Sequence, residues 1–261
     1  MSLPALLAGA QARADGFALT IPEDWHQGRT AYGGLSAALA LEAARRLGGA
    51  ALPPLCSALI SFVGPIAGDV LVSARVLRQG RNATWIAAEI GGAGGCGLAA
   101  SFVFMRRGTS RLALAGHAPP AGLIPLAEAK PVKLNAFSPV FLAHHFDLRF
   151  AQPRGPAPLP EICWWVRPRA TEGLAPETQL LLCADALPPG VLPLLDKQAR
   201  VSSMTWQFNL LDPAPATSDG WWLLRVAGEH AGGGMSSERL DVWNAEAAPM
   251  ATGQQAVALF D

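Results

Sequence analysis

Polar side chains in the second half of the chain have the chemistry needed to activate a water molecule. Asp185 follows the apolar run Leu180-Leu-Leu-Cys-Ala184, and Gln255 lies in the small and apolar segment 251–259. An ionised carboxylate in apolar surroundings is costly unless it is hydrogen-bonded or used, so Asp185 is a candidate general base. The alternative is a helix-end residue that faces water, because Asp before a Pro-Pro pair is common turn chemistry. The Gln255 amide can donate and accept at once, and so could hold a water or a carbonyl group.

Two hydroxyl side chains, those of Ser203 and Thr205, are candidates for the same site. Strand alternation predicts that they share one face of their strand, with Ser202 on the other face. Taken alone, each of them would be interpreted as an ordinary sheet position.

The first element that could position such a site is a helix over Gly33–Leu47. Nearly every residue in it favours helix, and Gly48-Gly49 ends it. The helix is apolar nearly all round, as expected when a sheet wraps it. Turn residues then separate four predicted strands, which indicates an antiparallel meander curled around the helix. These strands are Cys56–Val63, Asp69–Gln79, Ala83–Ile90 and Gly97–Arg106.

The second half of the chain repeats this order. A helix is predicted over Pro176–Leu187, with Pro176 in its first turn and Glu177 near the positive end of its dipole. The segments 57–105 and 203–259 look like versions of one unit, which predicts two lobes with a site where they meet. We expect an N-terminal domain over 1–110, a linker over 111–140 that packs against the sheets, and a C-terminal domain over 141–261. The predicted strands are Phe146–Phe150, Ile162–Arg167, Val201–Leu211, Trp221–Gly228, Ser237–Asn244 and Ala251–Phe260.

Composition limits the partners. The 261 residues include 20 basic and 20 acidic side chains without a long basic cluster, which argues against nucleic acid. No uninterrupted apolar run of about 18 residues is present, so no membrane span is expected. With 51% hydrophobic and only 15% charged residues, we expect a homo-oligomer that covers apolar surface. Four widely spaced cysteines favour buried thiols in a reducing cytoplasm.

Three other motifs are weaker. Gly92–Gly97 fits a dinucleotide fingerprint, but a strand-like run follows it where a helix is required, so a hairpin turn is predicted. Ser36 lies near a nucleophile-elbow pattern but inside a predicted helix, and the oxyanion-like run at His230 follows it in the chain when it should precede it. A serine hydrolase is therefore a minor hypothesis.

The five histidines show no metal-ligand spacing, so no metal and no cofactor are expected.

The chain resembles the double-hotdog acyl-CoA thioesterases, that is, the bacterial type II enzyme and its peroxisomal relatives. The resemblance rests on Arg29-Thr-Ala-Tyr-Gly-Gly34, Ser57–Pro65, Leu182-Cys-Ala-Asp185 and the position of Gln255. It implies an α+β fold of two fused hotdog domains, each an antiparallel sheet wrapped around a long helix. The chain departs from the family at its third catalytic residue, a Thr or Ser, where one alignment places Val201. By strand parity, Ser203 or Thr205 takes that position.

The resemblance also implies a mechanism. Asp185 would act as general base on a water held by Gln255 and the Ser203 or Thr205 hydroxyl, and that water would attack the thioester of an acyl-CoA. Tyr32, Gly33 and Gly34 would contact the substrate, and backbone N–H groups at this helix end or its counterpart in the second lobe would bind the oxyanion. The acyl tail would run between helix and sheet.

Arginines of the right sign for the CoA phosphates include Arg78, Arg81 and Arg167. The alternative function is a hotdog protein that binds acyl groups without hydrolysing them. A hydratase comes third, because its Asp/His loop pattern is absent from the sequence.

Overall fold

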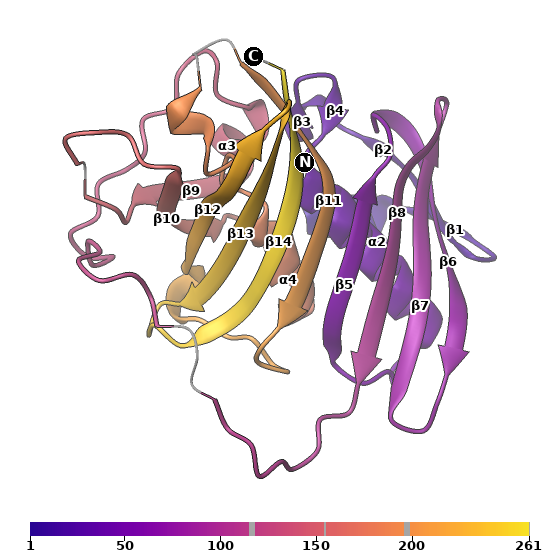
Figure 1. Cartoon of the computed structure of the whole chain (residues 1–261). Coiled ribbons are helices and arrows are strands. Elements are labelled where there is room, and N and C mark those ends of the chain that lie inside the picture. The colour runs from indigo at the N-terminus through magenta and orange to yellow at the C-terminus, as the bar shows by residue number, and fades with distance from the viewer. Residues whose placement is uncertain (115–117, 154, 196–198, 261) are drawn as a thin grey trace.

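A computed structural model describes residues 1–114, 118–153, 155–195 and 199–260 of the chain. The described strands form one 12-stranded antiparallel sheet in the order β1-β2-β6-β7-β8-β5-β11-β14-β13-β12-β10-β9, and a separate two-stranded hairpin, β3-β4. Figure 1 shows the sheet as two curved halves that meet edge to edge at β5 and β11, with a helix behind each half.

The N-terminal half begins with helix α1 (Leu3–Gly9) and a 3₁₀ turn at Glu23–Trp25. The long helix α2 spans Gly33–Gly48, so the prediction of Gly33–Leu47 is confirmed to within one residue. The strands of this half are β1 (Gln11–Arg13), β2 (Gly16–Ile21), β3 (His26–Gln27), β4 (Thr30–Ala31), β5 (Leu55–Phe62), β6 (Gly68–Gln79), β7 (Ala83–Gly92) and β8 (Gly95–Met105).

The C-terminal half has two helices, α3 (Val140–His145) and α4 (Pro176–Ala184), and 3₁₀ turns at Leu192–Leu194 and Ser218–Gly220. Helix α4 ends three residues before the predicted boundary. Asp185 forms its C-terminal cap, and Pro188 soon afterwards disfavours further helix. The strands are β9 (Phe146–Phe150), β10 (Glu161–Pro168), β11 (Arg200–Leu210), β12 (Trp222–Gly232), β13 (Met235–Asn244) and β14 (Pro249–Phe260).

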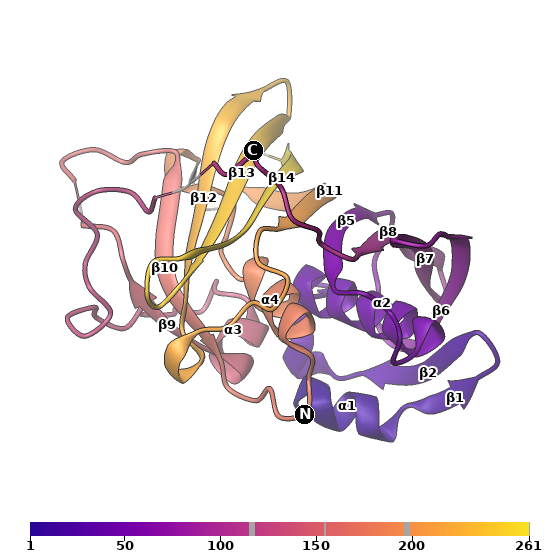
Figure 2. The ribbon, with the colours of Figure 1, turned by 90° about the horizontal axis from the view of Figure 1, so that it is seen from below.

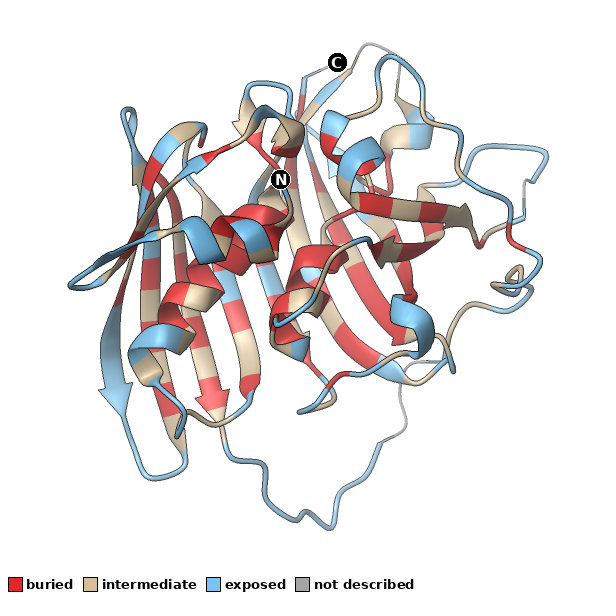
Figure 3. Ribbon diagram, turned by 180° about the vertical axis from the view of Figure 1, so that it is seen from behind, coloured by how far each residue is buried: buried red, intermediate tan, exposed pale blue. Residues whose placement is uncertain are grey.

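Helix α2 forms the centre of the core. Its small alanines let it lie close to β6, β7 and α4, and ten of its residues are buried. Figure 3 shows both helices in the concave side of the sheet, with buried positions along the surfaces that face it. Arg45 and Arg46 lie in the last turn of α2, where a positive charge is favourable to the helix dipole.

Polar contacts join α2 to α4 across the two halves. Arg45 forms an ion pair with Glu177, and the Thr178 hydroxyl donates to Glu42 Oε1 at 2.6 Å. The view in Figure 2 shows the two helices side by side beneath the sheet. This packing brings the N-terminal end of α2 next to the residue that caps α4.

Residues 123–126, in the segment between the two halves, cover part of the outer surface of the C-terminal sheet. Leu123, Ile124 and Leu126 pack against a cluster that includes Trp165 and Trp243, and the Trp165 indole N–H donates to the Ile124 carbonyl at 2.9 Å. The expected packing of this segment on a sheet is therefore seen, whereas the domain boundaries at 110 and 140 stay a prediction.

Two smaller predictions have different outcomes. The glycine run at 92–97 forms the turn between β7 and β8, as predicted. All four cysteines are free thiols, but only Cys163 and Cys183 are buried. The prediction of buried thiols is wrong for Cys96, which is exposed because it stands at this hairpin turn.

No helix in the described part of the chain is long and apolar enough to cross a membrane.

Candidate active site

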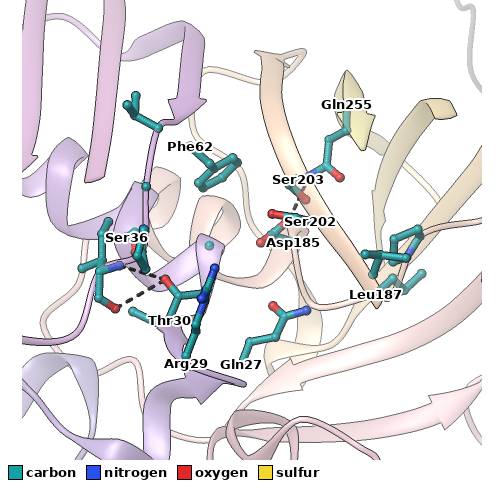
Figure 4. A pocket seen from close by; sticks show the side chains of 18 residues that line it. Gln27, Arg29, Thr30, Ser36, Phe62, Asp185, Leu187, Ser202, Ser203 and Gln255 are labelled. Carbon is teal, nitrogen blue, oxygen red and sulfur yellow. Dashed lines mark hydrogen bonds between the residues drawn. The ribbon is translucent and has the colours of Figure 1, made fainter. Parts of the chain in front are cut away.

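A cavity of about 330 Å³ lies where the two halves of the molecule meet. Its walls come from the β3-β4 hairpin, the first turns of α2, the end of β5 and the loop after it, the loop after α4, and strands β11 and β14 (Figure 4). The lining residues are Gln27, Arg29, Thr30, Ala31, Gly33, Ser36, Phe62, Val63, Gly64, Pro65, Ile66, Asp185, Leu187, Pro189, Val201, Ser202, Ser203 and Gln255.

Asp185 and Gln255 meet in this cavity. The Gln255 side-chain amide donates a hydrogen bond of 2.7 Å from Nε2 to Asp185 Oδ1. Asp185 stands at the C-terminal end of α4, and Gln255 projects from the face of β14 that is turned toward the helices. The fold therefore brings together two groups that are 70 residues apart in the chain.

The environment shifts the pKa of Asp185 toward neutrality. Burial raises the pKa of this carboxyl from 3.8 to about 7, because an ionised carboxylate loses hydration in the cavity wall. The hydrogen bond from Gln255 and the backbone N–H of Gly34 act in the opposite direction, since they stabilise the ionised form. A carboxyl with a pKa near the working pH is suited to accept and return a proton.

The glycines at the N-terminal end of α2 are needed for this close approach. A Cβ atom at Gly33 would lie 2.6 Å from Asp185 Oδ2, and one at Gly34 would lie 2.6 Å from the Leu182 carbonyl oxygen. Because these two residues have no side chains, the positive end of the helix dipole can face the Asp185 carboxylate. Gly33 lines the cavity, and Gly34 contributes through its backbone.

The hydroxyl candidates are separated by a β-bulge. In the β11-β14 ladder Ser203 lies opposite Val257 and Thr205 lies opposite Ala256, so Met204 is an extra residue. The bulge puts Ser203 on the face of Gln255 and Thr205 on the other face, where it is exposed. The prediction that both hydroxyls share a face is therefore wrong. Ser202 and Ser203 line the cavity, and Thr205 is not among its lining residues.

Tyr32 does not reach the cavity. It is completely buried, its hydroxyl donates to the Leu182 carbonyl at 2.7 Å, and its ring stacks on Phe141 at 4.0 Å. Burial, and then the nearby Asp185 charge, raise the pKa of this hydroxyl well above 10. Tyr32 links the start of α2 to α4 and is not among the described residues that line the cavity, so its contact with the substrate stays a prediction.

Ser36, the candidate nucleophile, and the three candidate CoA-binding arginines have other contacts in the structure. Ser36 is buried in α2, and its hydroxyl donates back to the Tyr32 carbonyl at 3.2 Å. Arg167 forms an ion pair with Asp147 at 2.7 Å, and Arg78 stacks over the Trp85 ring. Arg78, Arg81 and Arg167 are not among the described residues that line the cavity.

A buried glutamate that the sequence analysis missed holds the loop after Asp185. Glu238 is 1% exposed and lies directly opposite Gln255 in the β13-β14 ladder. Its carboxylate accepts hydrogen bonds from the Gly190 backbone N–H at 2.7 Å and the Ser236 hydroxyl at 2.8 Å. Strand β13, which pairs with the strand that carries Gln255, is thereby tied to the loop that begins at Asp185. The signal in the sequence was Glu238 itself, because a charged residue at an inward-facing strand position is unusual unless it is paired.

Glu238→Ala should lower the free energy of unfolding by about 1–3 kcal/mol, because the buried Gly190 N–H loses its acceptor. Glu238→Gln should have a smaller effect, since its amide oxygen can still accept. Urea unfolding followed by circular dichroism measures both. The matched control is Glu229→Ala at the exposed end of β12, expected within about 0.5 kcal/mol of the parent protein. Equal effects at 229 and 238 would contradict this account of the loop.

The fold and site define the class of the protein. Two antiparallel half-sheets, each wrapped around a helix and joined edge to edge, make a double hotdog with its cavity at the junction. Residues 21–105 match the acyl-CoA thioesterase N-terminal domain, and residues 119–259 match the acyl-CoA thioesterase C-terminal domain. The chain therefore belongs to the acyl-CoA thioesterase family.

Solved structures share the whole fold at low sequence identity. A hotdog-fold protein of unknown function from Alicyclobacillus acidocaldarius has a TM-score of 0.85 and 17% identity, covering 100% of this chain and 99% of its own. A putative thioesterase II from Thermobifida fusca has a TM-score of 0.79 and 19% identity, with coverages of 99% and 97%. An acyl-CoA thioesterase II from Mycobacterium marinum has a TM-score of 0.72 and 14% identity, with coverages of 99% and 98%. Comparison with curated protein sequences gives no significant match.

Proposed function

We propose that the protein hydrolyses acyl-CoA to a free acid and CoA by direct activation of water. The observation that carries the proposal is the hydrogen-bonded pair Asp185–Gln255 in the cavity at the junction of the two lobes. Membership in the acyl-CoA thioesterase family supports the choice of substrate class.

In the proposed reaction, Asp185 removes a proton from a water molecule while the water oxygen bonds to the thioester carbonyl carbon. The tetrahedral intermediate then collapses, the C–S bond breaks, and the leaving thiolate takes the proton back from Asp185. Gln255 Nε2 carries a second N–H besides the one bound to Asp185, and this N–H holds the water or the carbonyl oxygen. Ser203 is the preferred hydroxyl partner, because it lines the cavity on the same strand face as Gln255.

The α2 terminus has a changed role in this proposal. The Gly34 N–H is directed at the Asp185 carboxylate, so we assign this helix end to supporting the base in place of binding the oxyanion. The thioester enters beside the apolar walls at Phe62, Ile66 and Leu187. We further place the enzyme in the cytoplasm as a homo-oligomer, on the grounds of its unpaired cysteines and its large apolar fraction.

A panel of acyl-CoA thioesters of increasing chain length, with release of the free thiol followed colorimetrically, tests the activity. Hydrolysis of at least one thioester by the purified chain supports the proposal. The alternative is an acyl-binding protein without turnover, which is favoured by the position of Thr205 outside the cavity. Tight acyl-CoA binding with no thiol released across the panel would support that alternative.

The pH dependence should report the state of Asp185. Only the ionised carboxylate accepts a proton, so kcat/KM should fall about tenfold per pH unit below an apparent pKa near 7 and level off above it. Gln255→Leu should move the apparent pKa upward, because the ionised form loses a hydrogen bond. An acyl-pantetheine substrate avoids the titration of substrate phosphate near pH 6. A flat profile between pH 5 and 8 would exclude Asp185 as the base.

A further inference from the structure

The β3-β4 hairpin carries an arginine at the mouth of the cavity. Arg29 follows the turn residue Gly28, whose φ of 66° is in the left-handed region. Gln27, Gly28 and Arg29 are exposed, whereas Ile66 and Leu187 in the wall are buried, so the hairpin marks the open side. Figure 4 shows the Gln27 and Arg29 side chains next to each other on the hairpin side, with Asp185 and Gln255 beyond them.

The hairpin is fixed in this position by hydrogen bonds to the opposite wall. The Ala31 N–H donates to the Ile66 carbonyl at 2.6 Å, and the Ile66 N–H donates to the Thr30 hydroxyl at 2.9 Å. The Tyr32 N–H also donates to the Trp25 carbonyl at 2.8 Å. Arg29 therefore lies on a segment that hydrogen bonds hold in place, and its charge stays near the cavity mouth.

Arg29 differs from several other arginines in its position in the cavity lining and in its ion pairing. Among the described residues that line the cavity, Arg29 is the single basic side chain and Asp185 the single acidic one. Arg45, Arg167 and Arg225 are each engaged in ion pairs with carboxylates. No ion pair joins Arg29 to any carboxylate in the part of the chain that the structure describes. Its guanidinium is thus available to an external anion.

We propose that Arg29 binds the 4′-phosphate on the pantetheine arm of CoA. This inference rests on the proposed function. When the acyl group lies against the apolar walls and the thioester reaches Asp185, the carrier arm must leave through the mouth, where Arg29 stands. A guanidinium offers paired N–H donors that match two phosphate oxygens. Arg29 is accordingly a residue for carrier recognition and takes no part in the chemical step.

Three thioesters of one acyl group test this assignment: acyl-CoA, acyl-4′-phosphopantetheine and acyl-pantetheine, the last of which carries no phosphate. Arg29→Ala should raise KM about tenfold or more for the first two and leave KM for acyl-pantetheine unchanged, with kcat kept throughout. Arg29→Lys should recover part of the loss, because the charge stays and the paired donors are lost. The matched control is Arg75→Ala, an exposed arginine on β6 outside the cavity lining, which should change nothing.

Two results would overturn the assignment. An equal rise in KM for all three thioesters would show that Arg29 does not recognise phosphate. A rise for acyl-CoA alone would place the contact on the other phosphates of the nucleotide. If wild-type protein hydrolyses none of the three, the proposed function fails separately. Calorimetric titration of wild-type and Arg29→Ala protein with free CoA then still tests the contact, with at least tenfold weaker binding expected for the variant.

Discussion

Asp185→Asn should lower kcat for acyl-CoA hydrolysis by about 10²–10⁴-fold and leave substrate binding nearly unchanged. Asparagine has almost the same shape, and its side-chain oxygen can still accept the 2.7 Å hydrogen bond from Gln255. It cannot, however, take a proton from water at neutral pH. The measurement is thiol release under saturating substrate, with binding of CoA followed by calorimetry.

The same variant should be more stable than the parent protein at neutral and higher pH. The pKa of Asp185 is raised from 3.8 to about 7 by folding, so between these values the folded state binds more protons than the unfolded state. The free energy of unfolding of the parent therefore falls as pH rises from about 4 to 7, by roughly 1.4 kcal/mol per unit of pKa shift. Asparagine removes this loss.

Stability and activity together make the test specific. A variant that is inactive, folded and more stable above pH 7 identifies Asp185 as a residue kept for chemistry at the expense of stability. A variant that is inactive because it is unfolded would show a lower midpoint in urea. Hydrolysis at the parent rate by the folded variant would rule out Asp185 as the base.

Gly33→Ala should lower kcat by about 10²-fold while the protein stays folded. The new Cβ would lie 2.6 Å from Asp185 Oδ2 and 3.1 Å from the Phe62 ring, so the carboxylate has to move out of its place beside Gln255. A displacement of about 1 Å at a reacting group is enough for a loss of this size. The measurement is the same thiol-release assay, and a parent-like far-UV circular dichroism spectrum establishes the fold.

The control for Gly33→Ala is Gly94→Ala, in the β7-β8 turn. No atom beyond its two chain neighbours lies within 4 Å of a Cβ built there, and its φ is outside the left-handed region. This variant should keep parent-like kcat. Full activity of Gly33→Ala would mean that the carboxylate does not depend on close approach of the α2 terminus.

How far the sequence predicts the site depends on the residue. Asp185 and Gln255 are each a polar group in an apolar segment, and the resemblance to a family predicts that they share a site; the structure brings them into contact. Strand parity predicts that Ser203 and Thr205 share a face, but this rule assumes an uninterrupted ladder. The bulge at Met204 adds one residue to β11, so the parity changes and Thr205 turns to the outer face.

The sequence also does not predict in which direction the side chains of Tyr32 and Arg29 point. Both belong to the run 29–34, which leads into α2, and no local pattern tells which side chain points inward. The aromatic ring is buried against Phe141, whereas the arginine stays at the rim of the cavity. The direction of each side chain follows from how the β3-β4 hairpin is tied to Ile66.

Much of the secondary structure can be predicted from local sequence patterns. Helix α2, the two meanders and most strand boundaries follow from local periodicity and from glycine and proline turns, which depend on neighbouring residues alone. Which polar groups share a cavity depends on long-range contacts. That outcome requires β5 to pair with β11, α2 to pack against α4, and Glu238 to tie the loop after Asp185 to β13. These contacts join residues that are far apart in the chain, and a single bulge or buried hydrogen bond changes which side chains meet.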